Sequence, residues 1–348
     1  MTNQINAGGV PIGGGAPVTV QSMCDTDTRD AGATLAQIRA LSDAGCELVR
    51  VAVPDEDAAA ALKVITGASP IPVVADIHFD YKLAVAAAQN GAAKVRVNPG
   101  NIGSREKVRE VVKACADRGI PIRVGVNGGS VKRELLAKLG LREAMLRSGL
   151  EQAETLEELG FGDICLSFKA SGTADTVAVN RMAVSSPGWR WPLHLGVTET
   201  GTNGLIKSAA GIGALLLDGI GDTIRVSLTA PPTDEVAAGI ALLKAVGKRK
   251  GGVEIISCPT CARRGIDVVS LAREVEAELS DIQAPLKVAV MGCAVNGPGE
   301  AREADVGVAG GLDGFAVLFR SGEAVRKVRE RDIVHVLAGE ARTLVKER

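Results

Sequence analysis

The sequence predicts an α/β protein in which an N-terminal TIM (β/α)8 barrel, residues 1–247, precedes a small second α/β domain, residues 248–348. Three observations predict this fold class. Short β-branched runs bounded by Gly or Pro recur along the first part of the chain, Ala/Leu-rich segments with helical spacing separate them, and the alternation stops near residue 248. Eight strands alternating with helices suit a closed barrel better than a doubly wound sheet, which usually has fewer strands.

The barrel elements follow one another in regular order. The strands are predicted at 18–23, 47–53, 71–76, 93–99, 120–127, 163–169, 192–199 and 222–228. Between them, helical spacing of Ala, Leu and Val predicts helices that include 33–45, 81–91 and 105–119. Several of these segments close on Gly, as a helix C-cap does.

The second domain begins near residues 246–252, where Lys, Arg and Gly interrupt the apolar pattern. Its elements are predicted in the order strand, helix, three strands and a final helix. The first five of them span residues 253–257, 267–281, 286–292, 304–310 and 315–320. We therefore expect a separate small core beyond the barrel.

Composition excludes several classes of function. Hydrophobic residues make up 46% of the 348, which predicts ordered domains rather than disorder. A formal net charge of -1, a pI of about 6.4 and 2% aromatics offer no basic field or stacking platform for nucleic acid. No apolar run approaches the ~18 residues that span a bilayer. The seven cysteines, without a secretion signal, favour reduced thiols in a cytoplasmic protein.

Cationic residues gather in five of the eight predicted strands: Arg50, Arg96, Arg123, Lys169 and Arg225. Because side chains alternate along a strand and barrel chemistry collects at the carboxyl ends, these cations are expected to share the barrel mouth. Other polar residues lie near the same ends: Asp76, Asn98, Asn127, His194, Glu199 and Ser227. The donor geometry of guanidinium groups matches phosphate oxygens, so the pattern favours a phosphorylated substrate, and among these a diphosphate. The alternative is that each Arg pairs with Asp or Glu within the barrel.

Four residues of the barrel admit more than one role. His78 and His194 are each either a proton donor or a buried structural imidazole. Lys169, at a strand end, is a candidate for a Schiff base with a carbonyl substrate. Glu199 is either an acid/base group or a helix cap.

The cysteines divide into two groups. Cys46, Cys115 and Cys165 lie among Ala, Leu and Val and are predicted to be core residues, whereas Cys24 follows a strand and is a candidate reactive thiol. The other group is confined to the second domain: Cys258 and Cys261 bracket "PT" after one strand, and Cys293 follows another.

Three thiolates emerging from loops can hold a metal ion or a cluster. Zinc prefers four closed N/S ligands, and the one histidine of this domain, His335, lies in the predicted final helix. An iron-sulfur cluster normally takes four thiolates. Glu300, which ends "AVNGPGE", is a candidate fourth ligand after a Gly-Pro-Gly turn; Cys24 and an open position are the alternatives.

A series of motifs, in order from about residue 9 to about residue 310, resembles one known family. They are "VPIGGGAPVTVQSM", "DTDTRD", "LVRVAVP", "ADIHFDYKLA", "KVRVNPGNIG", "IRVGVN", "SFKAS", "LHLGVTETG", "IRVSLT", "SCPTC" and "MGCAVNGPGE". The chain is similar in these motifs to the bacterial 4-hydroxy-3-methylbut-2-enyl diphosphate synthases of the methylerythritol phosphate isoprenoid pathway. It lacks a large insertion between the two domains and so resembles the two-domain bacterial form.

The resemblance implies a TIM barrel followed by an iron-sulfur cluster domain, in a head-to-tail homodimer. It implies reductive ring opening of 2-C-methyl-D-erythritol 2,4-cyclodiphosphate, with loss of water and two electrons supplied by flavodoxin or ferredoxin. One 4Fe-4S cluster per chain would be held by Cys258, Cys261, Cys293 and Glu300. The matching substrate-binding positions are Arg50, Asp76, His78, Arg96, Arg123, Asn127, Lys169, Arg225, Ser227 and Asn296, with Glu199 as an acid/base group beside Glu300.

Departures from the family pattern are few. Cys24 and Asp25 stand where the family usually has Thr and Asn, Gly128 replaces Ala, and Ala262 replaces Gly. Cys24 is interpreted as a volume substitute for Thr. Two rival functions remain to be tested: a zinc-stabilised lyase that uses Lys169 as a Schiff base, and a non-catalytic cluster-bearing sensor of a phosphorylated metabolite.

Overall fold

The computed structural model describes residues 1–198, 203–311 and 314–348. The chain divides into two compact units, Met1–Arg249 and Lys250–Arg348, each of which has its own core. Glu199, a predicted catalytic residue, lies outside the described residues. No helix of the described segments is both long and apolar enough to cross a bilayer.

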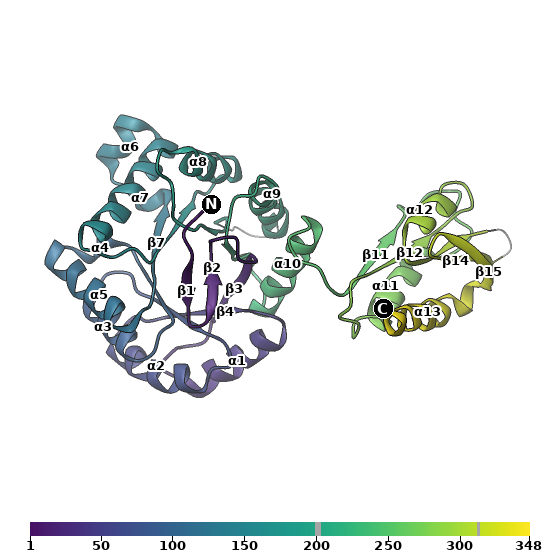
Figure 1. Cartoon of the computed structure of the whole chain (residues 1–348), viewed down its shortest axis with the longest axis horizontal. Helices are drawn as coiled ribbons and strands as arrows, with labels where there is room; N and C mark the ends of the chain where they lie inside the picture. The colour runs from purple at the N-terminus through teal and green to yellow at the C-terminus, as the bar shows by residue number, and fades with distance from the viewer. Residues whose placement is uncertain (199–202, 312–313) are drawn as a thin grey trace. The chain divides into compact units, whose positions relative to one another are not determined.

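Unit 1 is a parallel β-barrel surrounded by helices (Figure 1). Its eight strands pair in the order β8-β7-β6-β5-β4-β3-β10-β9, and a parallel bridge between Leu166 and Leu193 joins β8 to the segment entering β9. The strands are β3 (Thr19–Met23), β4 (Leu48–Ala52), β5 (Val73–Asp76), β6 (Lys94–Val97), β7 (Ile122–Asn127), β8 (Ile164–Lys169), β9 (His194–Leu195) and β10 (Thr223–Ile224). The predicted TIM barrel is confirmed.

The last two barrel strands are shorter than their β-branched runs suggested. Pro192, which has no N–H, precedes β9, and Gly196, which has no side chain to pack, follows it. In β10, ladder pairing ends at Ile224, so Arg225 lies one residue beyond the strand.

The barrel helices begin and end as their sequences dictate. They are α1 (Ala31–Asp43), α2 (Glu56–Ala68), α3 (Tyr81–Gln89), α4 (Pro99–Ile102), α5 (Arg105–Arg118), α6 (Arg133–Leu139), α7 (Leu141–Glu158), α8 (Thr173–Ser185), α9 (Gly204–Leu217) and α10 (Pro232–Ala245), with a 3₁₀ turn at Gly128–Ser130. The side chains of Asp30 and Asp55 cap α1 and α2 by accepting backbone N–H bonds. Gly119 ends α5 with φ of 62°, a left-handed conformation that suits glycine.

A β-hairpin that the sequence analysis did not anticipate closes one end of the barrel. Strands β1 (Ile5–Ala7) and β2 (Val10–Ile12) pair antiparallel. Ile5 and Ile12 form a small apolar cluster with Leu48, Val74 and Cys165, which lie near the amino ends of their strands. The hairpin therefore covers the end of the barrel opposite the carboxyl ends of the strands.

Unit 2 is a five-stranded sheet in the order β11-β12-β13-β14-β15, with helices packed on it. Its elements are β11 (Val253–Ser257), α11 (Val268–Glu278), β12 (Leu286–Met291), α12 (Gly297–Glu303), β13 (Val306–Gly310), β14 (Phe315–Arg320), β15 (Glu323–Arg329), a 3₁₀ turn at Glu330–Asp332 and α13 (Ile333–Glu347). The first three strands are parallel, and the last two pair antiparallel. The α/β character expected for this part of the chain is therefore present.

Two local expectations for unit 2 were wrong. The Gly-Pro-Gly segment does not turn the chain back but opens helix α12, because a proline is accepted in the first turn of a helix, where its missing N–H is not needed. Strand β15 was not predicted, because five of its seven residues are exposed in succession and carry no apolar alternation. It is a charged edge strand, which discourages pairing with other chains.

Candidate active site

The predicted cations of the barrel lie together at the carboxyl ends of the strands. Arg96 of β6 is in register with Asp76 of β5 and with Arg123 of β7, so the three side chains lie on one inward-facing rung. Gly125 leaves room for them, since a Cβ there would lie 3.2 Å from Arg96 Nε. The alternation of strand side chains thus brings these residues to one place, as the sequence predicted.

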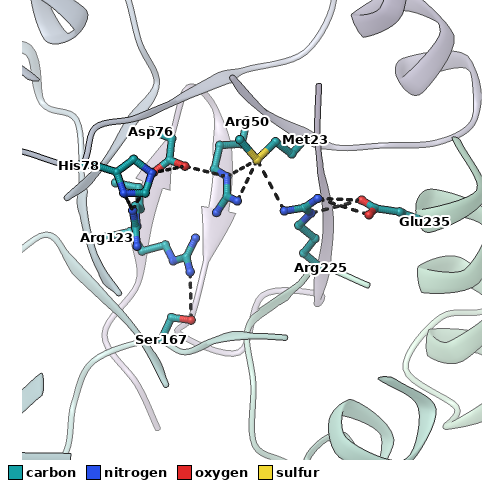
Figure 2. A network of polar contacts seen from close by, with 9 residues as sticks. Met23, Arg50, Asp76, His78, Arg123, Ser167, Arg225 and Glu235 are labelled. Atoms are coloured by element: carbon teal, nitrogen blue, oxygen red, sulfur yellow. Dashed lines mark hydrogen bonds and ion pairs between the residues drawn. The ribbon is translucent and has the colours of Figure 1, made fainter. Parts of the chain in front are cut away.

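The carboxylate of Asp76 contacts two arginines and a histidine (Figure 2). Its Oδ1 accepts a hydrogen bond from Arg96 Nη1 at 3.0 Å, and its Oδ2 lies 3.6 Å from Arg50 Nε and 3.5 Å from His78 Nε2. Burial alone would raise the pKa of Asp76, but the guanidiniums of Arg50 and Arg96 hold it below its usual value. Asp76 is therefore a carboxylate that orients the two arginines.

Arg225 has a carboxylate of its own. Glu235, in the first turn of α10, accepts hydrogen bonds from Arg225 Nε at 3.2 Å and Nη2 at 3.3 Å. The same carboxylate accepts bonds from Ser22 Oγ and from the backbone N–H of Leu228. Glu235 thus ties the loop after β10 to the barrel.

Met23 lies between Arg50 and Arg225, each of which also contacts a carboxylate (Figure 2). Its Sδ accepts bonds from Arg50 Nε at 3.0 Å and Nη2 at 2.9 Å, and Arg225 Nη1 lies 3.6 Å from the same atom. A thioether is a weak, neutral acceptor, so it bonds both guanidiniums without neutralising either. Met23 therefore adds no negative charge to that of Asp76 and Glu235.

Arg123 is the most deeply buried arginine of the cluster, and Lys169 lies half-buried among the arginines. Arg123 donates from Nη2 to Ser167 Oγ at 3.1 Å, while its Nε and Nη1 find no protein acceptor in the described parts of the chain. Burial lowers the pKa of Arg123 to about 9 and that of Arg50 to about 10, so both remain charged at neutral pH. Burial, then the charges of Arg123, Arg50, Arg225 and Arg96, lowers the pKa of Lys169 well below its ordinary value.

The glycine after β9 makes room for Lys169. A Cβ at Gly196 would lie only 2.4 Å from Lys169 Nζ, so no larger residue fits there without moving the amine. Around this mouth, five cationic side chains face the two carboxylates of Asp76 and Glu235 in the described segments. Such an excess of buried positive charge requires an anion, and guanidinium forks suit a phosphate or diphosphate.

The remaining predicted substrate-binding residues of the barrel are less enclosed. The side chain of His78 is 57% exposed beside Asp76. Asn127, the last residue of β7, is exposed, and its backbone exchanges hydrogen bonds with Ser130 Oγ. Ser227 is half-buried three residues after β10. His194 is fully buried in β9 rather than at the mouth.

Sequence analysis missed three members of this site. Met23 and Ser167 lie on inward-facing strand positions, and strand alternation was the signal that would have found them. Glu235 lies in a helix, where an acidic residue in the first turn is ordinarily explained by the helix dipole. Only its contact with Arg225 distinguishes it.

Unit 2 carries the second predicted site at the ends of β11 and β12. Cys258 follows β11, and its Sγ accepts a hydrogen bond from the Gly292 N–H at 3.2 Å. Gly292 is tightly packed, since a Cβ there would lie 2.7 Å from Val268 Cγ2 and 3.4 Å from Cys258 Sγ. The residue before Cys293 is thus held against Cys258, although Cys261 is exposed.

Backbone amides favour a thiolate at Cys293. Hydrogen bonds from the N–H groups of Val295 and Asn296 lower the pKa of its thiol, with a smaller contribution from Gly297. Asn296 is the N-cap residue of α12, and Glu300 lies exposed in the first turn of that helix. These residues lie on one short segment, as its sequence requires.

Within the described ranges, no three His, Cys, Asp or Glu side chains converge as they would around a single metal ion. A 4Fe-4S cluster makes a different demand, because each ligand binds a different iron and the ligands therefore lie farther apart. Three free cysteines on adjoining loops, one of them favoured as a thiolate, fit that donor set.

The other four cysteines are core residues. Cys46, Cys115 and Cys165 are buried, as predicted. Cys24 is 7% exposed and packs in the main barrel core, where burial raises the pKa of its thiol to about 12. It is an inert thiol rather than the reactive group that its strand-end position allowed.

Comparison with known proteins gives the family. The model described as the GcpE TIM-barrel domain matches residues 2–240, and the model described as the GcpE protein C-terminal domain matches residues 254–343. The chain belongs to the GcpE family. The two family domains correspond to the barrel and to the five-stranded unit, so both parts of the chain are accounted for.

Curated GcpE relatives are similar over their whole length. A protein of Geobacter sulfurreducens is 56% identical over 100% of this chain and 99% of its own, and one of Clostridium perfringens is 53% identical over 97% of each. A Bacillus subtilis protein is 51% identical over 99% of this chain and 92% of its own. All three are named 4-hydroxy-3-methylbut-2-en-1-yl diphosphate synthase (flavodoxin).

Among solved structures, the barrel is similar to dihydropteroate synthase of Yersinia pestis. The TM-score is 0.51 at 14% identity, covering 70% of this chain and 98% of that one. This likeness concerns the fold alone.

Proposed function

We propose that the chain catalyses the reductive ring opening of 2-C-methyl-D-erythritol 2,4-cyclodiphosphate to (E)-4-hydroxy-3-methylbut-2-enyl diphosphate, a precursor of isoprenoids. Counted as free acids, the reaction takes up two electrons and two protons and releases one water. The observation that carries the proposal is the excess of buried cations at the barrel mouth, in a chain whose full-length relatives bear the name of this synthase.

The barrel residues bind and orient the diphosphate. Arg50, Arg96 and Arg225 present guanidiniums already held by Asp76, Met23 and Glu235, which lowers the entropy lost when they grip the phosphates. Arg123, on the same rung as Arg96, adds to the positive charge, and Lys169 lies among the same arginines. His78, Asn127 and Ser227 complete the proposed contacts, and Asn296 is assigned to the substrate from the segment that follows Cys293.

In unit 2, Cys258, Cys261, Cys293 and Glu300 would hold one 4Fe-4S cluster per chain. A bound cluster would supply the two electrons one at a time. Support comes from the free thiols, the amide groups that favour the Cys293 thiolate, and the exposed carboxylate one helical turn beyond Asn296. A carboxylate in place of a fourth thiolate would be the more weakly held ligand, so Glu300 would give the cluster one exchangeable position.

Glu199 is proposed as the acid that protonates the departing hydroxyl group. Its place in the chain supports this role, since it comes four residues after β9, at the carboxyl end of a barrel strand.

The proposed partners are flavodoxin or ferredoxin as electron donor and a second copy of the chain in a head-to-tail homodimer, in the cytoplasm. Exposed apolar side chains support a protein contact on the mouth side of the barrel: Phe79 follows β5, and Leu205 and Ile206 begin α9. In unit 2, Val295 is 66% exposed beside Cys293. Apolar side chains at the two sites would be covered if a cluster unit of one copy docked on the barrel of another.

A lyase that forms a Schiff base on Lys169 is the alternative that the lowered pKa of this lysine favours. Burial and the charges of the surrounding arginines explain that pKa equally well, and a bound diphosphate would offset the effect of the arginines. Borohydride trapping distinguishes the two functions, because a Schiff-base enzyme is labelled at Lys169 and loses activity, whereas the proposed synthase is not.

The deciding experiment is anaerobic purification followed by iron and sulfide analysis and a turnover assay. We expect a brown protein with about four irons per chain, which converts the cyclodiphosphate when given a strong one-electron donor. Stoichiometric zinc without iron would contradict the proposal. An intact cluster without turnover would favour the non-catalytic sensor.

The fourth-ligand assignment has its own test in Glu300→Ala. We expect a cluster that loses about one of its four irons and a protein without turnover, while binding of the cyclodiphosphate to the barrel is retained. Iron analysis and calorimetric titration measure the two properties separately, and Glu303→Ala, in the same helix, is the matched control. Full activity of Glu300→Ala would refute the assignment.

A further inference from the structure

One charged residue inside the barrel has no role in the proposed reaction. Lys94 is the first residue of β6 and lies two positions before Arg96, so it points to the same inward face one rung deeper. It is completely buried, and its Nζ has no hydrogen-bond partner within the described chain. A buried ammonium group without a partner is strongly disfavoured, so the residue calls for a functional explanation.

The groups that face Lys94 come from several strands. Arg123 on β7 and Arg50 on β4 repel its charge, whereas the Cys165 thiol on β8 favours it. His194 on β9 also lies within electrostatic range. Burial first, and then these two arginines, lowers the pKa of Lys94 to about 8. No ion pair with a carboxylate offsets this effect among the residues that the structure describes.

Lys94 is one of several polar residues buried inside the barrel. The side chain of Gln21 on β3 and both ring nitrogens of His194 are likewise buried and without partners in the described chain. Most TIM barrels fill their interior with Val, Ile and Leu. Here apolar residues share the interior with the polar ones: Val74 is in register with Lys94, and Leu48, Val74 and Cys165 pack against the β1–β2 hairpin.

We propose that Lys94 is a positioning residue of the diphosphate site, whose ammonium charge adds to the cluster and is retained to higher pH when the anionic substrate is bound above it. The inference rests on the proposed function, because it requires a diphosphate between Arg50 and Arg123. The empty barrel loses this buried charge as the pH rises through about 8, and at that pH the occupied barrel takes up a proton.

The direction of the effect follows from linkage. Two negative charges near Arg50 and Arg123 cancel the repulsion that these residues exert on Lys94, so the pKa of Lys94 rises on binding. A group whose pKa rises in the complex strengthens binding below its free pKa, and this contribution disappears as the pH rises through its bound pKa. Affinity for the substrate should therefore fall between about pH 8 and pH 9.

The test is calorimetric titration of the cluster-loaded protein with the cyclodiphosphate, without an electron donor, in two amine buffers of different protonation enthalpy. Each phosphorus of this ligand has one strongly acidic hydroxyl, so the ligand itself does not titrate in the range. We expect uptake of up to about half a proton per chain at pH 8. Lys169 and His194 also face the arginines, so the difference between variants, rather than total uptake, identifies Lys94.

In Lys94→Met, the uptake at pH 8 should fall, and binding at pH 7 should weaken about tenfold, the equivalent of one pKa unit. The gap between the two proteins should close above about pH 9.5. Methionine matches lysine in volume and removes an unpaired buried charge, so the variant should fold. Lys94→Gln is the second variant if it does not, and Lys113→Met, at an exposed position of α5, is the control.

The outcomes separate the two proposals. If wild type and Lys94→Met take up the same number of protons on binding, and the ratio of their affinities does not change with pH, the role of Lys94 is overturned. The proposed function is then left intact. Failure of the wild-type protein to bind the cyclodiphosphate at all would overturn both.

Discussion

The two sites of this chain are constructed in different ways. The barrel site is made of side chains on or just beyond hydrogen-bonded strands, joined by Glu235 from helix α10, and its arginines are held by Asp76, Glu235 and Met23 before any ligand is present. The cysteine site is made of loops, and among the described residues backbone hydrogen bonds are donated to the thiols of Cys258 and Cys293. Cys261 is exposed.

The barrel site is preorganised for its ligand, whereas the cysteine site would be completed by the proposed cofactor. Charged groups fixed by a scaffold bind an anion with little loss of entropy. Thiolates on loops gain their final arrangement when the metal binds, and metal affinity then contributes to folding. Changes in the cysteine site should therefore be felt in metal content, and changes in the barrel site in substrate affinity.

The largest effect is expected for Cys293→Ala. Loss of the thiolate that the amides of Val295 and Asn296 favour should reduce the iron content from about four per chain to a small remainder. Turnover should fall below detection. Binding of the cyclodiphosphate, measured by calorimetry, should stay within about twofold of wild type because the barrel is unchanged.

Cys115→Ala is the matched control for that variant. It also removes one thiol, but from the buried face of α5. It should keep its iron and its activity while the melting temperature falls by a few degrees, as for a small core deletion. A Cys293→Ala protein with normal iron would show that the loop does not bind the cluster.

Much of the barrel site could be predicted from sequence because strand alternation is simple. Short β-branched runs fix the strands, and period-two spacing then places Arg96 and Arg123 on one rung. The same logic could not find Glu235, since the residue reaches Arg225 from a helix, and that approach depends on how α10 packs. Nor could it assign Lys94, because a lysine at a strand position ordinarily marks the solvent face.

For the cysteine site, the sequence indicated the ligand residues better than the backbone conformation around them. The spacing of Cys258, Cys261 and Cys293 indicated ligands, but the segment before Glu300 was interpreted as a turn and is helix α12. Gly and Pro are turn formers in isolation, whereas here they follow Asn296 at the N-cap position, and proline fits the first turn. The position of these residues at the start of a helix therefore outweighed their preference for turns.

A smaller effect, confined to substrate affinity, is expected for Arg123→Met. This residue donates one hydrogen bond, to Ser167, and keeps two donor nitrogens without protein acceptors in the described segments. Loss of charge-assisted bonds to a phosphate should weaken binding about a hundredfold. Calorimetry with the cyclodiphosphate measures this, and absorption near 400 nm reports the cluster, which should remain normal.

The thermal stability of Arg123→Met is a second readout. Replacing a buried cation with an apolar side chain of similar length should leave the melting temperature unchanged or raise it. A variant that lost its cluster, or melted well below wild type, would show that Arg123 supports the fold rather than the ligand.

The smallest effect is expected for Cys24→Thr, which tests whether a thiol at the carboxyl end of β3 belongs to the cysteine site or to the barrel. Burial raises the pKa of Cys24 to about 12, so at neutral pH it is a thiol and a poor iron ligand. Thr26 already bonds to its sulfur, and a threonine hydroxyl can take over that bond. Iron content and turnover should therefore stay within about twofold, and stability within about 1 kcal/mol. Loss of iron in this variant would make Cys24 the fourth ligand in place of Glu300, and the two sites would then share a residue instead of dividing anion binding and metal binding between them.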